Sequence, residues 1–250
     1  MKKLPKRRTA NPVLRWFVDE SSYAKESTSE FYKIRRKIRP GDVLLVEVRS
    51  LISRLIRLFT HSRWTHCALY IGHAPEISRY QHTPIPAETD PRSNSAWLIE
   101  ANPGEGVVAS PLEKYSRHNL RICRPRQLST RARQKVIENA INYLDGQYDL
   151  LLILHLAVFI LVGSFLPFAG GGYSHPFRSD STRMICTGLI WRAFDPVRFV
   201  VFPFGGHLKP DQHPLQKGTA LLTPSIFLQS PNFRVIEPLG FLSGGRHLMA

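Results

Sequence analysis

The sequence predicts an α+β fold with a mostly antiparallel sheet. Apolar residues make up 43% of the 250 residues, which is ample for a hydrophobic core. Short runs with the composition of β-strands follow one another between turn signals, so neighbouring strands are expected to pair locally. Two later segments carry apolar residues at helical spacing. Together these patterns indicate one domain with additions, or at most two small domains.

The first predicted strand follows a turn. Arg39-Pro40-Gly41-Asp42 is a turn signal, and the apolar run at 43–48 has the length and composition of a buried strand. The folded domain is therefore expected to occupy residues 40–240. Residues 50–60 resemble a basic amphipathic helix, which we expect to pack on the core with its arginines in water. A helix lying on a membrane surface is the alternative.

A second strand is predicted at 65–71, where successive side chains point to opposite faces of the sheet. His66 and Cys67 therefore cannot form a pair with each other. Cys67 is best interpreted as a small buried side chain, and so is Cys123 in a later predicted strand. Taken alone, His66 is more often structural than catalytic.

Glu100 ends a third predicted strand at 96–100, which follows a long polar loop at 73–95. A carboxylate beside the histidine strand could hydrogen-bond the imidazole, hold its tautomer and stabilise its cation. A solvated glutamate before the Pro103-Gly104 turn is the alternative, and the sequence gives the two interpretations equal weight.

Two more strands are predicted at 106–109 and 120–124, followed by a helix that Ser129 caps and that continues through Leu144. The expected apolar face of this helix consists of Val136, Ile137, Ala140, Ile141 and Leu144. With this order of strands and helix, each strand is expected to pair mostly with strands that are close to it in the sequence.

A helix around Cys186 carries the most chemical information. The polar residues at 179–182 offer several N-caps, a buried stripe runs from Ile185 to Phe194, and Asp195-Pro196 ends the helix. Cys186 then lies in the first turn or just past it, where the positive end of the helix dipole lowers the pKa of a thiol. A nearby imidazole could take the thiol proton, so Cys186 and His66 are a candidate catalytic pair.

The 19 residues at 150–168 carry no charge and are interrupted only by His155, Gly163, Ser164 and Pro167. This length is about the minimum for a membrane-spanning helix. A single span would place the two halves of the candidate pair on opposite sides of the bilayer. We therefore expect membrane contact without crossing, and a helix buried in the core or in a dimer interface is the alternative.

Residues 1–39 are predicted to be a basic, flexible leader. The first 40 residues hold 12 Lys and Arg against four acidic residues, a net +8 of the total +15. Such a block is typical of a solvated tail. It would be attracted to an anionic membrane surface by about 1 kcal/mol per basic residue held close to it. No recognised nucleic-acid module is present, so no specific nucleic-acid partner is expected.

The cysteine count and the N-terminus indicate the compartment. Three cysteines are too few for a disulfide framework, and no apolar run of a cleavable signal peptide follows the basic start. A cytoplasmic location is expected, peripheral or monotopic at the inner membrane. No cofactor is expected and no metal, since His61, His66 and His73 follow no known ligand spacing.

Short motifs occur in a fixed order along roughly residues 40–236. They are GDVLL at 41–45, SRWTH at 62–66, LIEA at 98–101, GVV at 106–108, GQYD at 146–149, ICTG at 185–188, LTPS at 222–225 and SPNF at 230–233. In this order they resemble the YiiX/YaeF-type permuted papain-like amidases of the NlpC superfamily. The resemblance implies a circularly permuted papain-like fold, with the sheet packed against the nucleophile helix. It implies Cys186 as nucleophile, His66 as general base and Glu100 as the residue that orients the base.

The activity implied by the resemblance is thiol hydrolysis of an amide or ester, in a peptide or a lipid, through a thioester. The same superfamily contains lecithin:retinol acyltransferase-like enzymes, so a lipid acyl hydrolase or acyltransferase at the membrane is one alternative. A catalytically silent, membrane-associated binding protein is another. The loop at 73–95, the apolar segment at 150–168 and the basic leader depart from the family pattern.

Overall fold

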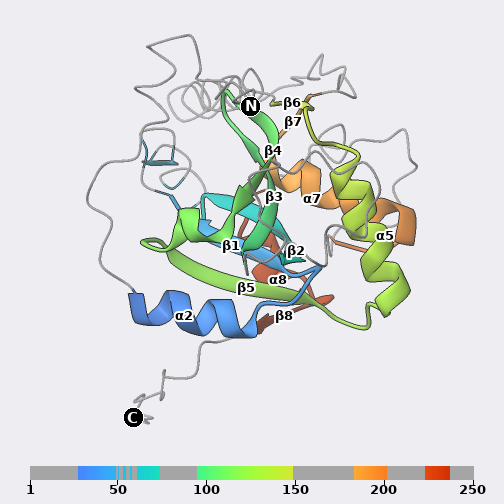
Figure 1. Ribbon diagram of the computed structural model, residues 1–250, viewed down its shortest axis with the longest axis horizontal. Helices are drawn as coiled ribbons and strands as arrows, with labels where there is room; N and C mark the ends of the chain where they lie inside the picture. Colours follow the sequence, from blue (N-terminus) through green and yellow to red (C-terminus); the bar gives the residue numbers. More distant parts are fainter. Residues whose placement is uncertain are drawn as a thin grey trace, which may run out of the picture.

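The computed structural model describes residues 28–48, 50, 53–54, 57, 61–73, 95–148, 183–201 and 223–236. These residues build a six-stranded sheet with the order β4-β3-β2-β1-β5-β8 (Figure 1). Its strands are β1 (Val43–Glu47), β2 (His66–His73), β3 (Ala96–Asn102), β4 (Gly106–Pro111), β5 (Asn119–Pro125) and β8 (Phe233–Ile236). Every neighbouring pair is antiparallel. The predicted α+β class and the antiparallel pairing are confirmed.

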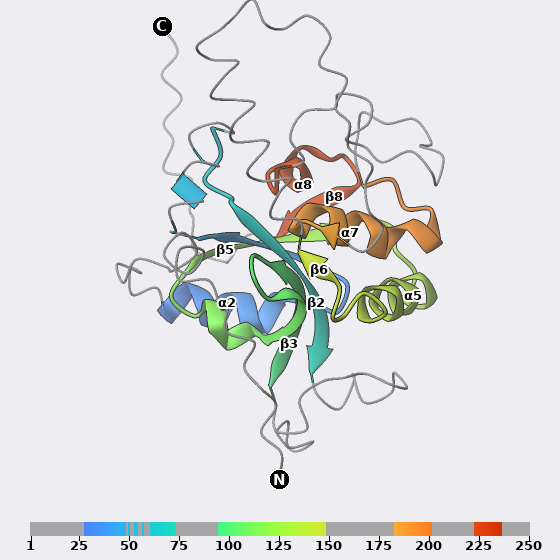
Figure 2. The ribbon, with the colours of Figure 1, turned by 90° about the horizontal axis from the view of Figure 1, so that it is seen from above.

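Helices cover both faces of this sheet (Figure 2). One face packs on α2 (Thr28–Lys37), and the other packs on α5 (Thr130–Ile141) and α7 (Cys186–Phe194). The side chains of β1 and β2 alternate between these two cores, so every residue of β1 is buried. Double-sided burial explains why the strands have continuous apolar runs instead of alternating polar and apolar residues.

Helix α2 corrects the prediction that residues 1–39 are a flexible leader. Phe31, Ile34 and Ile38 are spaced at helical intervals, and all three are buried against the sheet. The exposed side of the helix carries Lys33 and Arg36. The high density of positive charge made the apolar stripe hard to recognise in the sequence, and α2 is part of the fold that the described residues form. Residues 1–27 lie outside the described part of the chain.

The turn before β1 is fixed by a buried carboxylate. Asp42 accepts hydrogen bonds from the backbone N–H of Arg39 at 2.8 Å and from Arg124 Nε at 2.9 Å and Nη2 at 2.8 Å. Arg124 Nη2 also donates to the carbonyl of Lys37 at 2.6 Å, so one guanidinium joins α2, the turn and β5. The predicted turn at 39–42 is confirmed.

Helix α5 begins as predicted, with the side chain of Ser129 accepting from the N–H of Ala132 at 3.1 Å. Four of the five predicted core positions are buried, namely Val136, Ile137, Ala140 and Ile141. The helix ends at Ile141 and not at Leu144, because residues 142–145 form a turn in which Asp145 has a φ of 65°.

A small parallel pair lies between α5 and α7, and the sequence did not predict it. Strand β6 (Gln147–Tyr148) pairs with β7 (Arg183–Met184), which brings the chain to the start of α7. The turn before β6 is held by Gly146, whose carbonyl accepts from the N–H of Val107 at 2.8 Å. Gly106 has a φ of 85°, and a Cβ there would lie 2.3 Å from that carbonyl oxygen, so only glycine fits.

Several predicted segments fall wholly or mostly outside the described residues. The apolar segment at 150–168 is one of them, and its membrane contact stays a prediction. The loop at 73–95 is described only at its two ends, and the helix at 50–60 only in part, with helical geometry at 53–54 and 57. Among the residues that the structure describes, no helix combines the length and the apolar character needed to cross a membrane.

Candidate active site

Cys186 is the first residue of α7. The N-cap is Ile185, in an extended conformation and without a side-chain cap, and the first intrahelical bond runs from the N–H of Leu189 to the carbonyl of Ile185 at 2.9 Å. The prediction that residues 179–182 cap this helix is therefore wrong, because β7 continues through Met184 before the helix starts. The predicted first-turn position of Cys186 is confirmed, with the thiol at the positive end of the helix dipole.

Packing against the sheet holds α7 in place. The helix contacts β2 and β3, the strands that carry the two other predicted site residues. Its buried stripe is the predicted one and consists of Ile185, Leu189, Ile190, Ala193 and Phe194. The helix end also agrees with the prediction, because a 3-10 turn at Asp195–Val197 follows Phe194.

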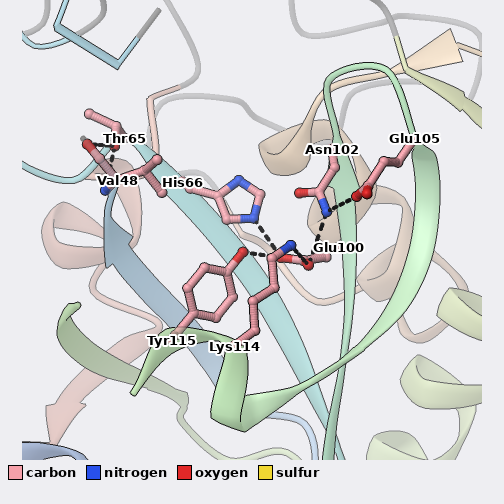
Figure 3. A network of polar contacts seen from close by, with 8 residues as sticks. All are labelled: Val48, Thr65, His66, Glu100, Asn102, Glu105, Lys114 and Tyr115. Carbon is pink, nitrogen blue, oxygen red and sulfur yellow. Dashed lines mark hydrogen bonds and ion pairs between the residues drawn. The ribbon is translucent and has the colours of Figure 1, made fainter. Parts of the chain in front are cut away.

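His66 and Glu100 are in direct contact. They lie on neighbouring strands, and Nε2 of His66 is 2.8 Å from Oε2 of Glu100 (Figure 3). Glu100 is 0% exposed and β3 continues beyond it to Asn102, so the interpretation of a solvated glutamate at a strand end is wrong. The carboxylate holds the imidazole ring in one orientation.

The segment that leads into His66 is pinned to the end of β1. Thr65 Oγ1 accepts from the N–H of Val48 at 3.0 Å and donates to the carbonyl of Val48 at 3.3 Å (Figure 3). The N–H of Thr65 donates to the carbonyl of Val46 at 3.2 Å. These bonds fix the backbone immediately before His66, and Glu100 fixes the imidazole ring itself. Both constraints together determine the position of the imidazole.

Cys186 and His66 shift each other's pKa, which places the thiol near the imidazole, so the structure brings all three predicted residues together. Nε2 of the imidazole is occupied by Glu100, which leaves Nδ1 as the ring nitrogen that can face the sulfur. The order of contacts is therefore sulfur, imidazole, carboxylate. This is the arrangement in which an orienting group fixes a base beside a nucleophile.

The pair favours its charged form. Burial opposes the charge of His66, but the hydrogen bonds to Cys186 and Glu100 outweigh burial and raise the pKa of the imidazole to about 9. A hydrogen bond from Cys67, together with the hydrogen bond and the charge of His66, holds the pKa of the Cys186 thiol well below its usual range despite burial. Both shifts favour transfer of the proton from the thiol to the imidazole.

Cys67 has a polar role that its expected place in the core did not suggest. Its side chain is fully buried, as predicted, in the same apolar core as Cys186. It also donates a hydrogen bond to Cys186, and burial together with this bond raises the pKa of the Cys67 thiol well above its usual range. Cys123 is buried as predicted, and burial raises the pKa of its thiol to about 12.

Three further side chains surround Glu100, and sequence reasoning missed all of them (Figure 3). Lys114 Nζ lies 2.6 Å from Oε1, Asn102 Nδ2 donates to the same oxygen at 3.0 Å, and the Tyr115 hydroxyl donates to Oε2. Asn102 could have been found from strand alternation, because it is two residues after Glu100. No pattern marks Lys114 and Tyr115, which belong to the four-residue 3-10 helix η1 (Leu112–Tyr115).

The donors explain how a buried glutamate stays ionised. Burial opposes the charge, but the hydrogen bond to His66 and the charge of Lys114 hold the pKa of Glu100 well below its usual range. The described residues contain no group of three or more His, Cys, Asp and Glu arranged to hold a metal ion. The chemistry that these described side chains support is that of a thiolate, an acid–base imidazole and an orienting carboxylate.

Comparison with known proteins agrees with this chemistry. Residues 37–155 match the family model described as "Permuted papain-like amidase enzyme, YaeF/YiiX, C92 family". The matched stretch contains His66 and Glu100, whereas Cys186 lies beyond it. A search of curated proteins found no match.

A solved structure, that of the metalloprotein yiiX from Escherichia coli O157:H7, is similar with 17% sequence identity and a TM-score of 0.43. The alignment covers 80% of this chain and 97% of the E. coli chain. By the family model, residues 37–155 of the present chain are similar to the YaeF/YiiX permuted papain-like amidases, a family of cysteine hydrolases.

Proposed function

We propose that this protein hydrolyses an amide bond through a thioester formed on Cys186. The observation that carries the proposal is the 2.8 Å contact between His66 and Glu100 on two strands that pack against α7, the helix that begins at Cys186. A thiol enzyme needs a thiolate at neutral pH, a proton donor beside it and a group that holds the donor in place. These three buried side chains supply one group for each need.

The reaction follows from the two charges. The Cys186 thiolate attacks the amide carbonyl carbon, and the carbonyl electrons move onto oxygen. His66 as the imidazolium gives its proton to the amide nitrogen as the carbon–nitrogen bond breaks, which leaves a thioester and a free amine. Neutral His66 then takes a proton from water, the resulting hydroxide attacks the thioester, and Cys186 leaves as a thiolate. Glu100 remains ionised throughout and stabilises the imidazolium.

The developing oxyanion needs a donor of its own. The backbone N–H of Cys186 precedes the first intrahelical hydrogen bond of α7, so it has no partner within the helix. A fixed N–H at a helix N-terminus, beside the attacking sulfur, is suited to stabilise negative charge on the carbonyl oxygen. We assign this N–H as one oxyanion donor.

An amide substrate suits the protonation state of His66. An amine leaves only with a proton, whereas a phenolate or alkoxide ester leaving group depends less on an acid. With a pKa of about 9, His66 keeps its proton at neutral pH until the leaving group needs it. The family match to amidases points to the same substrate class.

Acyl p-nitroanilides and p-nitrophenyl esters with matched acyl groups would test this proposal. We expect the wild type to cleave members of both series. Cys186→Ala should lose all activity toward both. Cys123→Ala removes a buried thiol away from the pair and should keep activity. Intact mass spectrometry should trap the acyl group on Cys186 during turnover of the ester.

Two results would reject the proposal. One is cleavage that survives in Cys186→Ala at the wild-type rate. The other is alkylation of Cys186 by iodoacetamide with an ordinary thiol pKa near 8.5 that does not change in His66→Ala, as expected of a catalytically silent binding protein. Release of acyl groups only from lipids in detergent micelles would favour the lipid acyl hydrolase instead.

A further inference from the structure

We propose that Lys114 and Tyr115 are positioning residues that act on His66 through Glu100. This inference rests on the proposed function, because it concerns the same acid–base pair. Both residues contact the carboxylate that holds the imidazole (Figure 3). The Tyr115 ring also lies beside the His66 ring, with centroids 6.1 Å apart, whereas the Tyr115 hydroxyl and Lys114 reach the imidazole through Glu100.

Four donors bind the carboxylate of Glu100, two at each of its oxygens. Oε2 accepts from His66 and from the Tyr115 hydroxyl, and Oε1 accepts from Lys114 and Asn102. A carboxylate can accept about four hydrogen bonds, so this buried group has its full set of donors. A fifth donor has no place, and the orientation of the carboxylate is determined by the four that it has.

The donors compete for the charge of Glu100. Tyr115 shares the oxygen that binds His66, so its hydroxyl withdraws electron density from the bond that holds the imidazolium. Lys114 places a positive charge 2.6 Å from the other oxygen and weakens the attraction between the carboxylate and the imidazolium. Both residues therefore reduce the proton affinity of His66 while they keep Glu100 ionised.

This moderation has a chemical purpose. His66 must give its proton to the leaving amine and later take one from water, so an imidazolium that is held too tightly would not act as an acid. A carboxylate with no other donors would hold the proton more strongly, especially in a buried site. Lys114 and Tyr115 thus adjust the strength of the acid through their contacts with Glu100.

Ionisable groups from four elements surround His66 and Glu100. His66 and Cys67 come from β2, Glu100 from β3, Lys114 and Tyr115 from η1, and Cys186 from α7. Glu105, in the turn between β3 and β4, accepts from Asn102 at 2.9 Å, and His118 stacks edge-on against Tyr115 with ring centroids 5.3 Å apart. Among these ionisable groups, Lys114 and Tyr115 donate to Glu100 in addition to His66, and the neutral Asn102 is the fourth donor.

The test is the titration of His66 by NMR of its imidazole Cε1–Hε1 signal, assigned by its loss in His66→Ala. In Tyr115→Phe and in Lys114→Met the midpoint of His66 should rise by about 0.5 to 1 pH unit, because Glu100 holds the proton more strongly. The alkaline limit of hydrolysis should rise with it, and Lys114→Arg should restore both. Lys135→Met, which removes an exposed lysine of α5, should leave the midpoint at the wild-type value.

The outcomes separate the two proposals. If wild-type His66 and Cys186 are both neutral at pH 7, the proposed function fails. If the wild type holds the charged pair but neither variant moves the midpoint of His66, the proposed function stands and Lys114 and Tyr115 have only a structural role. Should Lys114→Met lose its fold by circular dichroism, Tyr115→Phe decides alone, since it removes one oxygen atom and keeps the ring.

Discussion

The thiol of Cys67 lies in the same buried cluster as Cys186 and lowers the pKa of Cys186, although the two cysteines lie far apart in the sequence. Cys67 follows His66 directly, so the imidazole and the thiol that contact the nucleophile are consecutive residues of β2. One short stretch of strand therefore supplies two side-chain interactions that stabilise the thiolate, in addition to the backbone N–H of Cys67. The second interaction is neutral, which adds stability to the thiolate without adding another charge to a buried site.

Removal of this thiol should make Cys186 less acidic. In Cys67→Ala we expect the pKa of Cys186 to rise by roughly one pH unit, because its largest stabilising hydrogen bond is lost. Cys67→Ser, whose hydroxyl can still donate, should retain much of the effect. The measurement is the iodoacetamide rate against pH with Cys123→Ala as the background. An unchanged midpoint in Cys67→Ala would show that Cys67 only fills space.

Loss of the charge on Glu100 should move His66 in the opposite direction from loss of Lys114 or Tyr115. In Glu100→Gln the imidazolium loses its anionic partner, so the pKa of His66 should fall from about 9 toward its usual range. An anionic partner stabilises the protonated imidazole and raises its pKa, so removal of the partner lowers this pKa. The alkaline limit of hydrolysis should therefore move to lower pH. A rise in the midpoint would contradict the role of Glu100.

Strand alternation accounts for the part of the site that could be predicted from the sequence. It placed His66 and Cys67 on opposite faces of one strand, and it allowed Glu100 on the neighbouring strand to reach the imidazole. The helix dipole argument placed Cys186 at an N-terminus, where the structure has it. These inferences work because side-chain direction in regular elements depends on position alone.

Irregular and highly charged segments explain what could not be predicted. Lys114 and Tyr115 lie in one turn of 3-10 helix, which is too short to have a detectable period. The apolar stripe of α2 was hidden among basic residues. The hydrogen bond of Cys67 depends on how closely α7 approaches β2, and this distance is set by tertiary packing that no local pattern encodes.

The buried pair of Asp42 and Arg124 should make a large contribution to stability. Arg124→Met leaves the carboxylate of Asp42 without its bidentate partner, and breaking a buried pair in this way costs about 3 to 5 kcal/mol at pH 7. Asp42→Asn combined with Arg124→Met should recover part of the loss, because no unpaired charge remains. Urea denaturation followed by circular dichroism measures both values.

The same variant should show a distinctive pH dependence. Burial already raises the pKa of Asp42 above its usual 3.8, and removal of Arg124 should raise this pKa further. The folded state then binds the proton more tightly than the unfolded state, so the stability contribution of this group increases as the pH falls through the folded-state pKa. The deficit of Arg124→Met relative to wild type should therefore shrink as the pH falls through the raised folded-state pKa of Asp42. A constant deficit from pH 7 to 4 would contradict an unpaired Asp42 charge as its cause.

Gly106 should tolerate no side chain, because two independent constraints act on it. Its φ of 85° is unfavourable for an L-residue, and an added Cβ would meet the carbonyl oxygen of Gly146 at 2.3 Å. That carbonyl accepts from Val107, so a shift to relieve the contact would break the link between β4 and the turn before β6. We expect Gly106→Ala to lose about 2 to 4 kcal/mol in urea denaturation.

A matched control separates the local clash from a general effect of the substitution. Gly188→Ala adds the same methyl group in α7, where the nearest atom outside the helix backbone would be 3.7 Å away, at the side chain of Ile185. Alanine favours a helix over glycine by about 1 kcal/mol, so this variant should be as stable as the wild type or more stable. Equal losses in Gly106→Ala and Gly188→Ala would show that the contact with Gly146 does not determine the effect.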